Sequence, residues 1–149
     1  WLTDGRTAAT RARANDTPQA GVFDFPLNSD TGALAVAFAP QCTADMRAHA
    51  KDALAAAGFV PYEIGDAPGL IVARTVAMLV NEAADAVQQG VCSAQDADTA
   101  MKLGVNYPAG PFEWLDQLGA PYVIGVLNAL ADVTRSERYR ASPYLAERI

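Results

Sequence analysis

The chain carries few of the side chains from which chemical sites are usually built. Among its 149 residues there are one histidine and two cysteines. Cys42 and Cys92 do not form a CxxC or other metal-spaced pair, and a chain of this length can bury a core without a disulfide framework. We therefore expect no metal site, reduced thiols and a cytoplasmic location.

Long apolar runs and basic clusters are also missing. Arg74, Asn81, Glu82 and Asp85 interrupt the most apolar segment before it reaches the roughly 18 residues that span a bilayer. A net charge of −6 without a local Lys/Arg cluster argues against nucleic-acid binding. The chain starts at Trp1, and no basic stretch leads into an apolar run, so we expect an excised piece without a signal peptide.

Glycine-rich phosphate loops are absent as well. Gly104, Gly110 and Gly119 fit neither GxxxxGK[ST] nor the dinucleotide fingerprint GxGxxG. Their spacing is instead typical of glycines that end or separate helices.

What the chain does have is hydrophobic residues, at 51%, in a pattern that changes near Asp66. Before Asp66, small and turn-forming residues break every apolar run, whereas after it the spacing is helical almost to the end. We expect a small α/β segment over residues 1–65 and a helical domain over residues 66–149.

The first part predicts strands at residues 21–25, 33–38 and 59–64. Pro61 places the third strand at a sheet edge or makes it irregular, because proline lacks a ladder donor. A helix over residues 44–57 is predicted between the second and third strands, with Thr43 as its cap and Gly58 just past its end. A helix at residues 6–14 is the least supported element, because its only apolar residues are alanines.

The second part predicts five helices with short connections. The first would open at Asp66-Ala67-Pro68 and close at Gly90. The others are expected to begin at Ser93 with Asp96 in a capping box, at Gly110-Pro111, near Tyr122 after Pro121, and near Pro143. The expected fold class is therefore mainly α, preceded by the small α/β segment.

Each residue that could carry chemistry also has a plainer interpretation. His49 lies among charged helix residues and is expected to be solvated. Glu82 and Asp85 could do acid–base work but lack further ligands, and Cys92 lacks a basic neighbour. Lys102 and Arg74 could meet a coenzyme phosphate, although pairing with an acidic neighbour is favoured. A weaker hypothesis keeps an active site at Glu82, Lys102 or Asn106.

Several ordered motifs resemble the C-terminal region of 3-hydroxyacyl-CoA dehydrogenases. They are PGLIVAR at 68–74, NEA at 81–83, DTAMKLG at 98–104, YP at 107–108, GPFE at 110–113, LD at 115–116, RY at 138–139 and SP at 142–143. The resemblance implies a helical domain of the 6-phosphogluconate dehydrogenase C-terminal type, preceded by a remnant of a Rossmann sheet.

In that family an N-terminal Rossmann domain binds NAD, and the helical domain covers the acyl-CoA site and mediates dimerisation. The enzyme oxidises a 3-hydroxyacyl-CoA to the 3-oxoacyl-CoA: hydride passes to NAD, while a histidine oriented by a glutamate takes the hydroxyl proton. The resemblance therefore implies NAD, acyl-CoA, an N-terminal NAD-binding domain of the same protein and a homodimer as partners of the full-length enzyme.

The resemblance also places the family's histidine near Phe23, its glutamate near Ala35, and its asparagine at Ala73. None of these side chains can transfer a proton or hold a substrate oxygen. We therefore expect no catalytic, cofactor-binding or metal residue here, and expect the chain to be a second, degenerate copy within a long bacterial form of the enzyme. The alternative is a non-catalytic module for dimerisation or acyl-CoA binding.

Overall fold

The computed structural model describes residues 1–27 and 32–148, and their contacts divide the chain into two units. We call Trp1–Ala73 the sheet unit and Arg74–Ile149 the helical unit. Ile149, the end of the expected tail, lies outside the described residues. The described part is mainly helical with one small sheet, as the sequence predicts.

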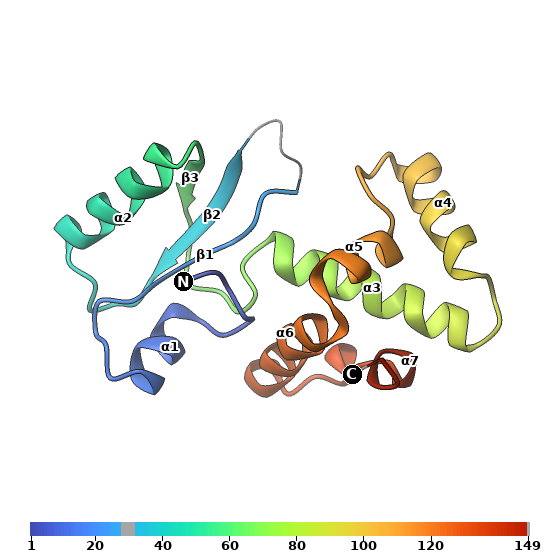
Figure 1. Ribbon diagram of the computed structural model, residues 1–149. Coiled ribbons are helices and arrows are strands. Elements are labelled where there is room, and N and C mark those ends of the chain that lie inside the picture. Colours follow the sequence, from blue (N-terminus) through green and yellow to red (C-terminus); the bar gives the residue numbers. More distant parts are fainter. Residues whose placement is uncertain (28–31, 149) are drawn as a thin grey trace. The chain divides into compact units, whose positions relative to one another are not determined.

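The sheet unit contains a three-stranded sheet with a helix on each face (Figure 1). β1 (Gly21–Phe23) runs antiparallel to β2 (Ala33–Phe38), and β3 (Val60–Glu63) runs parallel to β2. The three predicted strands are confirmed, and β3 lies at an edge as Pro61 indicates. β1 is two residues shorter than expected, because Asp24, which would continue the strand, instead binds the backbone amides of residues 71–73.

The two faces of the sheet are covered by α1 (Ala8–Ala14) and α2 (Ala44–Ala56). Ala8 and Ala12 of α1 pack with residues of β1 and β2, whereas Ala50 and Leu54 of α2 lie against the opposite face. The predicted α2 is confirmed to within a residue: the Thr43 hydroxyl accepts from Met46 N at 3.3 Å, and Gly58 follows at a φ of +90°.

α1 forms although its own residues support it weakly. Thr7 caps it locally, and Asp66 accepts hydrogen bonds from Ala8 N at 2.7 Å and Ala9 N at 2.9 Å. The expectation that Asp66 opens the long helix is therefore wrong. Asp66 caps α1 instead, and this long-range bond supplies what seven residues rich in alanine lack.

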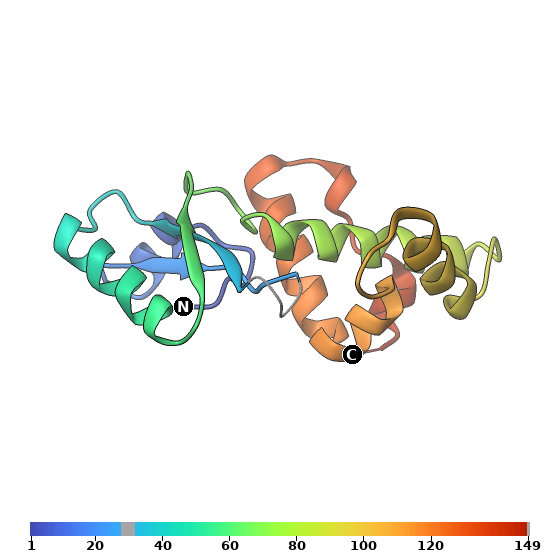
Figure 2. The same cartoon turned by 90° about the horizontal axis from the view of Figure 1, so that it is seen from above.

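The helical unit is built around α3 (Val72–Gln88), which starts at the end of the sheet unit. It is followed by α4 (Ala94–Val105), α5 (Pro111–Leu118), α6 (Ala120–Thr134), the 3₁₀ turn η1 (Glu137–Tyr139) and α7 (Pro143–Ala146) (Figure 2). The five predicted helices are confirmed, with shifted ends. α4 does not end at Gly104 but continues to Val105, and Asn106 follows as a left-handed cap with a φ of 57°.

A buried polar bridge fastens the C-terminal segment to α3. The Asn81 side chain, 2% exposed, donates to Arg140 O at 3.0 Å and accepts from Ser142 N at 2.7 Å. Further along α3, the side-chain oxygen of Gln88 accepts from Tyr144 N at 2.9 Å. These bonds satisfy backbone groups that have no helical partner, so Asn81 and Gln88 have structural roles.

Candidate functional site

Among the described residues of the sheet unit, Asp24, just after β1, has the most deeply buried carboxylate. Its side chain is fully buried and closes the N-terminus of α3. Oδ2 accepts from Ile71 N at 2.9 Å and Val72 N at 2.6 Å, and Oδ1 accepts from Ala73 N at 2.9 Å. These are the amides that a helix start leaves without intrahelical partners.

The long helix therefore starts where Asp24 binds it, not at Pro68 as the sequence predicts. Gly69 and Leu70 have φ values of 70° and 49°, in the left-handed region that no helix continues through. The capping residue lies 47 to 49 positions away from the amides it binds. No local pattern could have indicated it.

Burial raises the pKa of the Asp24 carboxyl above its ordinary value, and the backbone amides of Val72, Ala73, Ile71 and Phe25 act in the opposite direction. The carboxyl is out of contact with solvent and its oxygens are used by backbone donors. A general base needs a free lone pair within reach of the substrate proton. Asp24 as placed here is a helix cap.

The three positions picked out by the family resemblance lie around Asp24. Phe23 precedes it, Asp24 N donates to Ala35 O at 2.9 Å, and Ala73 N donates to its carboxylate. The side chain of Phe23 packs on the α2 face of the sheet, whereas Ala35 belongs to the cluster on the α1 face. The residue across from Ala35 is therefore Asp24, not Phe23.

Next to Ala35 lies an apolar hollow of about 240 Å³. It is lined by Ala33, Leu34, Ala35, Tyr62, Ile64, Ile71 and Val72. Tyr62, which is 60% exposed, is the only lining residue with a polar side-chain group. The hollow can accept an apolar group, and its lining contains no carboxylate or imidazole that could act as a general base.

The only β–α–β crossover among residues 1–27 and 32–148 is β2–α2–β3. In dinucleotide-binding folds, glycines at such a strand–helix turn let a pyrophosphate reach the helix amides. Here residues 39–43 contain no glycine, the Thr43 hydroxyl already binds Met46 N, and Asp45 places a negative charge in the first turn. These residues do not fit the pyrophosphate of NAD.

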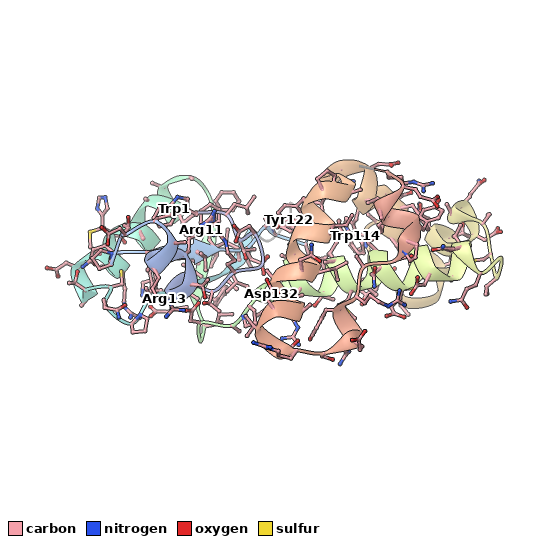
Figure 3. The ribbon with its side chains drawn as sticks, turned by 90° about the horizontal axis from the view of Figure 1, so that it is seen from below. Trp1, Arg11, Arg13, Trp114, Tyr122 and Asp132 are labelled. Carbon is pink, nitrogen blue, oxygen red and sulfur yellow. The ribbon has the colours of Figure 1, made fainter. Side chains whose placement is uncertain are left out.

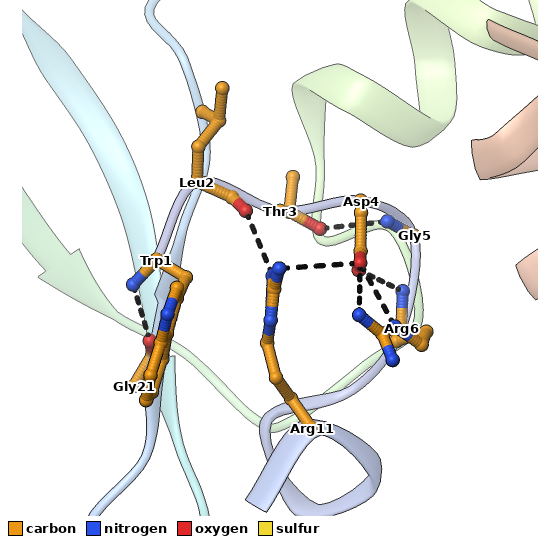
Figure 4. Close-up of polar contacts among 8 residues, drawn as sticks. All are labelled: Trp1, Leu2, Thr3, Asp4, Gly5, Arg6, Arg11 and Gly21. Atoms are coloured by element: carbon orange, nitrogen blue, oxygen red, sulfur yellow. Dashed lines mark hydrogen bonds and ion pairs between the residues drawn. The ribbon is translucent and has the colours of Figure 1, made fainter. Parts of the chain in front are cut away.

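The first three residues of the chain, which we call the N-terminal strap, bind the edge of β1 that does not pair with β2. Phe23 N donates to Trp1 O at 2.9 Å, and Thr3 N donates to Phe23 O at 2.8 Å. Arg11 lies over the Trp1 ring at 5.6 Å and 3.4 Å from the Asp4 carboxylate (Figures 3 and 4). Burial acts to raise the pKa of Asp4, but the hydrogen bonds from Arg6 together with the charges of Arg11 and Arg6 outweigh it, so the pKa lies below its ordinary value. The N-terminal strap therefore has a structural role, since its backbone bonds hold it against β1.

The other candidates from the sequence are scattered. His49 is exposed on α2, and Cys92 is half-buried in the turn before α4. Glu82 is exposed on α3, and Asn106 is the left-handed cap of α4. Among the described residues no three His, Cys, Asp or Glu side chains gather closely enough to hold a metal ion, and no helix is both long and apolar enough to cross a membrane.

Lys102 pairs with an acidic neighbour, as expected: its ammonium binds the carboxylate of Glu113 on α5. Glu113 also accepts from Gly110 N at 2.9 Å, which closes a capping box at the start of α5. Asp98 of α4 accepts from Phe112 N at 2.7 Å. Residues of the DTAMKLG and GPFE motifs thus form one junction that joins α4 to α5.

This junction predicts how stability varies with acid. The Lys102 hydrogen bond, followed by Gly110 N–H, lowers the pKa of Glu113 below its ordinary value. A carboxyl with a depressed folded-state pKa stabilises the fold above its unfolded pKa and loses that contribution as pH falls through the folded value. We expect Glu113→Gln to flatten the loss of stability between about pH 5 and pH 3, measured by urea midpoints. An unchanged acid profile would contradict this role.

Comparison with known proteins identifies the family. The profile of the 3-hydroxyacyl-CoA dehydrogenase C-terminal domain matches residues 69–149. The profile of the 3-hydroxybutyryl-CoA dehydrogenase reduced Rossmann-fold domain matches residues 1–68. The chain belongs to the 3-hydroxyacyl-CoA dehydrogenase family.

Individual relatives agree. A 3-hydroxyadipyl-CoA dehydrogenase of Escherichia coli is 50% identical over 91 residues, which cover 61% of this chain and 19% of that protein. A 3-hydroxybutyryl-CoA dehydrogenase of Clostridioides difficile is 36% identical over 90 residues, 60% of this chain and 32% of the relative. The chain thus matches only a fifth to a third of the length of these relatives.

Solved structures extend the likeness to almost the whole chain. The crystal structure of an Escherichia coli 3-hydroxybutyryl-CoA dehydrogenase superposes with a TM-score of 0.91 and 39% identity, over 99% of this chain and 30% of that one. A Ralstonia eutropha (S)-3-hydroxybutyryl-CoA dehydrogenase, 22% identical with a TM-score of 0.78 over 98% of this chain and 52% of that one, shows the same fold. The family uses NAD, and its C-terminal region is what this chain matches.

Proposed function

We propose that this chain is a non-catalytic, architectural module of an NAD-dependent 3-hydroxyacyl-CoA dehydrogenase, namely its second, degenerate copy. Residues 1–65 would be the Rossmann remnant and residues 66–149 the helical domain. The observation that carries the proposal is Asp24, the carboxylate across from Ala35, whose oxygens accept hydrogen bonds from the backbone amides of residues 71–73 at the start of α3. A group in that state cannot take the hydroxyl proton of a substrate.

The match to a reduced Rossmann-fold domain supports the same function. With Thr43 and Asp45 at the start of α2, NAD would bind to the N-terminal domain of the full-length protein and not to this segment. The acyl-CoA substrate would bind there too, in a cytoplasmic homodimeric enzyme. This chain would contribute packing surface that holds the catalytic part in its active arrangement.

A second candidate is a module that acts without any attached dehydrogenase, for dimerisation or acyl-CoA binding. It is favoured by exposed apolar side chains around α4: Val91 is 73%, Leu103 is 83% and Val105 is 56% exposed. Apolar surface of this kind marks interfaces. An NAD-binding domain in the same polypeptide would exclude the independent module.

The test compares NAD reduction with a 3-hydroxyacyl-CoA by the 149-residue chain and by the full-length protein at equal molar concentration. We expect turnover only by the full-length protein, since the carboxylate across from Ala35 is occupied by backbone amides and the β2–α2 turn does not fit a pyrophosphate. As a control, Asp52→Ala in the full-length protein, which changes an exposed acid of α2, should leave turnover unchanged. Turnover by the isolated chain would refute the non-catalytic assignment.

A further inference from the structure

The helical unit has a hollow of about 350 Å³ that the proposed function does not use. Five of its lining residues come from one side of α3, and the sixth, Arg138, comes from η1. The lining comprises Arg74, Thr75, Met78, Leu79, Glu82 and Arg138. It therefore combines two guanidinium groups with the apolar side chains of a methionine and a leucine.

Arg74 is held in place by a residue of the core. Its guanidinium donates to the hydroxyl of Tyr139 and lies 5.5 Å from the centre of the Tyr139 ring. Tyr139 is 3% exposed, so it cannot follow a moving partner. An arginine fixed in this way loses little conformational freedom when an additional acceptor binds.

Neither arginine of the hollow has a carboxylate within ion-pair distance among the described residues. Arg6, Arg11, Arg47, Lys51 and Lys102, by contrast, each lie within such reach of an aspartate or glutamate. Arg74 thus lacks the acidic partner that the sequence favours for it, and the charges of both guanidinium groups that line the hollow are not neutralised by an ion pair. An anion would supply the missing acceptor.

Arg74 and Glu82 are the first and last residues of α3 that line the hollow, and they carry opposite charges. Glu82 follows Arg74 on α3 by about two helical turns, roughly 12 Å. Met78 and Leu79 lie between them in sequence and line the same hollow. The guanidinium of Arg74 is thus followed along α3 by an apolar stretch, and Glu82 disfavours a second negative charge at the other end of that stretch.

We propose that this hollow binds a carboxylate at the end of a short aliphatic chain, with the carboxylate on Arg74 and Arg138 and the methylenes on Met78 and Leu79. The planar guanidinium matches a carboxylate through two parallel hydrogen bonds. The apolar stretch adds nothing for inorganic phosphate but stabilises methylene groups. The site stands apart from the proposed function, since it needs neither NAD nor turnover.

The test is calorimetric titration of the protein with hexanoate, acetate and inorganic phosphate. Hexanoate should bind more tightly than acetate by about tenfold or more, because each buried methylene contributes. Leu79→Ala should reduce hexanoate affinity while leaving acetate affinity unchanged. Phosphate bound as tightly as hexanoate would overturn the assignment to an aliphatic carboxylate.

Arg138→Gln separates this site from general attraction to positive charge. Arg138 is exposed, so the variant should fold, and we expect hexanoate affinity to fall by about tenfold with the loss of a charged hydrogen bond. Arg13→Gln, the same change at an exposed arginine of α1, should have no effect. Undetectable hexanoate binding, or equal affinity in Arg138→Gln and the unaltered protein, would also overturn the proposal.

Discussion

Asp24→Ala is expected to lower the free energy of unfolding by about 3 kcal/mol, because the amides of Ile71, Val72 and Ala73 at the start of α3 lose the buried carboxylate that accepts from them. An ordinary N-cap loss costs about 1 kcal/mol. The larger value follows from burial, which keeps water from replacing the carboxylate. Urea unfolding followed by circular dichroism measures the change.

Two variants separate the cap from a general effect of removing an acid. Asp24→Asn keeps one acceptor oxygen but turns an amide donor toward donors, so its stability should fall between those of the alanine variant and the unaltered protein. Asp52→Ala removes an exposed acid of α2 and should change stability by less than about 0.5 kcal/mol. If Asp24→Ala unfolds at the same urea concentration as Asp52→Ala, the cap does not stabilise α3.

Gly110→Ala should destabilise the protein by about 2–4 kcal/mol through overpacking. A Cβ at this position would lie 2.3 Å from Asp98 Oδ1 and 2.4 Å from Asp98 Cβ and Cγ. Asp98 would have to move, and Phe112 N would lose its 2.7 Å bond. Because φ at Gly110 is −82°, the cost comes from this contact and not from backbone strain. Thermal unfolding measures it.

The matched control is Gly125→Ala, in the middle of α6, where an added Cβ meets nothing within 4 Å. That variant should be more stable by about 0.5–1 kcal/mol, since alanine is the better helix former. Combining Gly110→Ala with Asp98→Gly should cost less than the sum of the two single changes, because the second removes the colliding side chain. Additive costs would count against the close contact.

Elements fixed by neighbouring residues could be predicted closely. α2 was predicted to within one residue because its cap, Thr43, and its terminating Gly58 are adjacent to it in sequence. The capping box of Ser93 and Asp96 likewise marked the start of α4. Local chemistry decides these ends, so a sequence pattern is enough.

Elements fixed by distant residues could not be predicted from the sequence. The start of α3 depends on Asp24, and α1 depends on Asp66, bonds that only the folded chain brings together. The arrangement of the candidate site around Asp24 also depends on contacts between residues that are distant in sequence. The resemblance placed the three altered positions in one neighbourhood, but which side chain lies across from Ala35 depends on strand register, and one residue of shift exchanges the faces of a strand.

The outer edge of β3 has a consequence for how the protein behaves at high concentration. Val60 N and Ile64 N donate inward to Gly32 O and Val36 O, so the N–H positions of residues 61 and 63 point outward. Pro61 has no N–H, which leaves Glu63 as the only outward donor of the strand, and its side chain is charged. A strand from another molecule would find one donor where a β-ladder needs a regular series, so this edge of the sheet resists edge-to-edge aggregation.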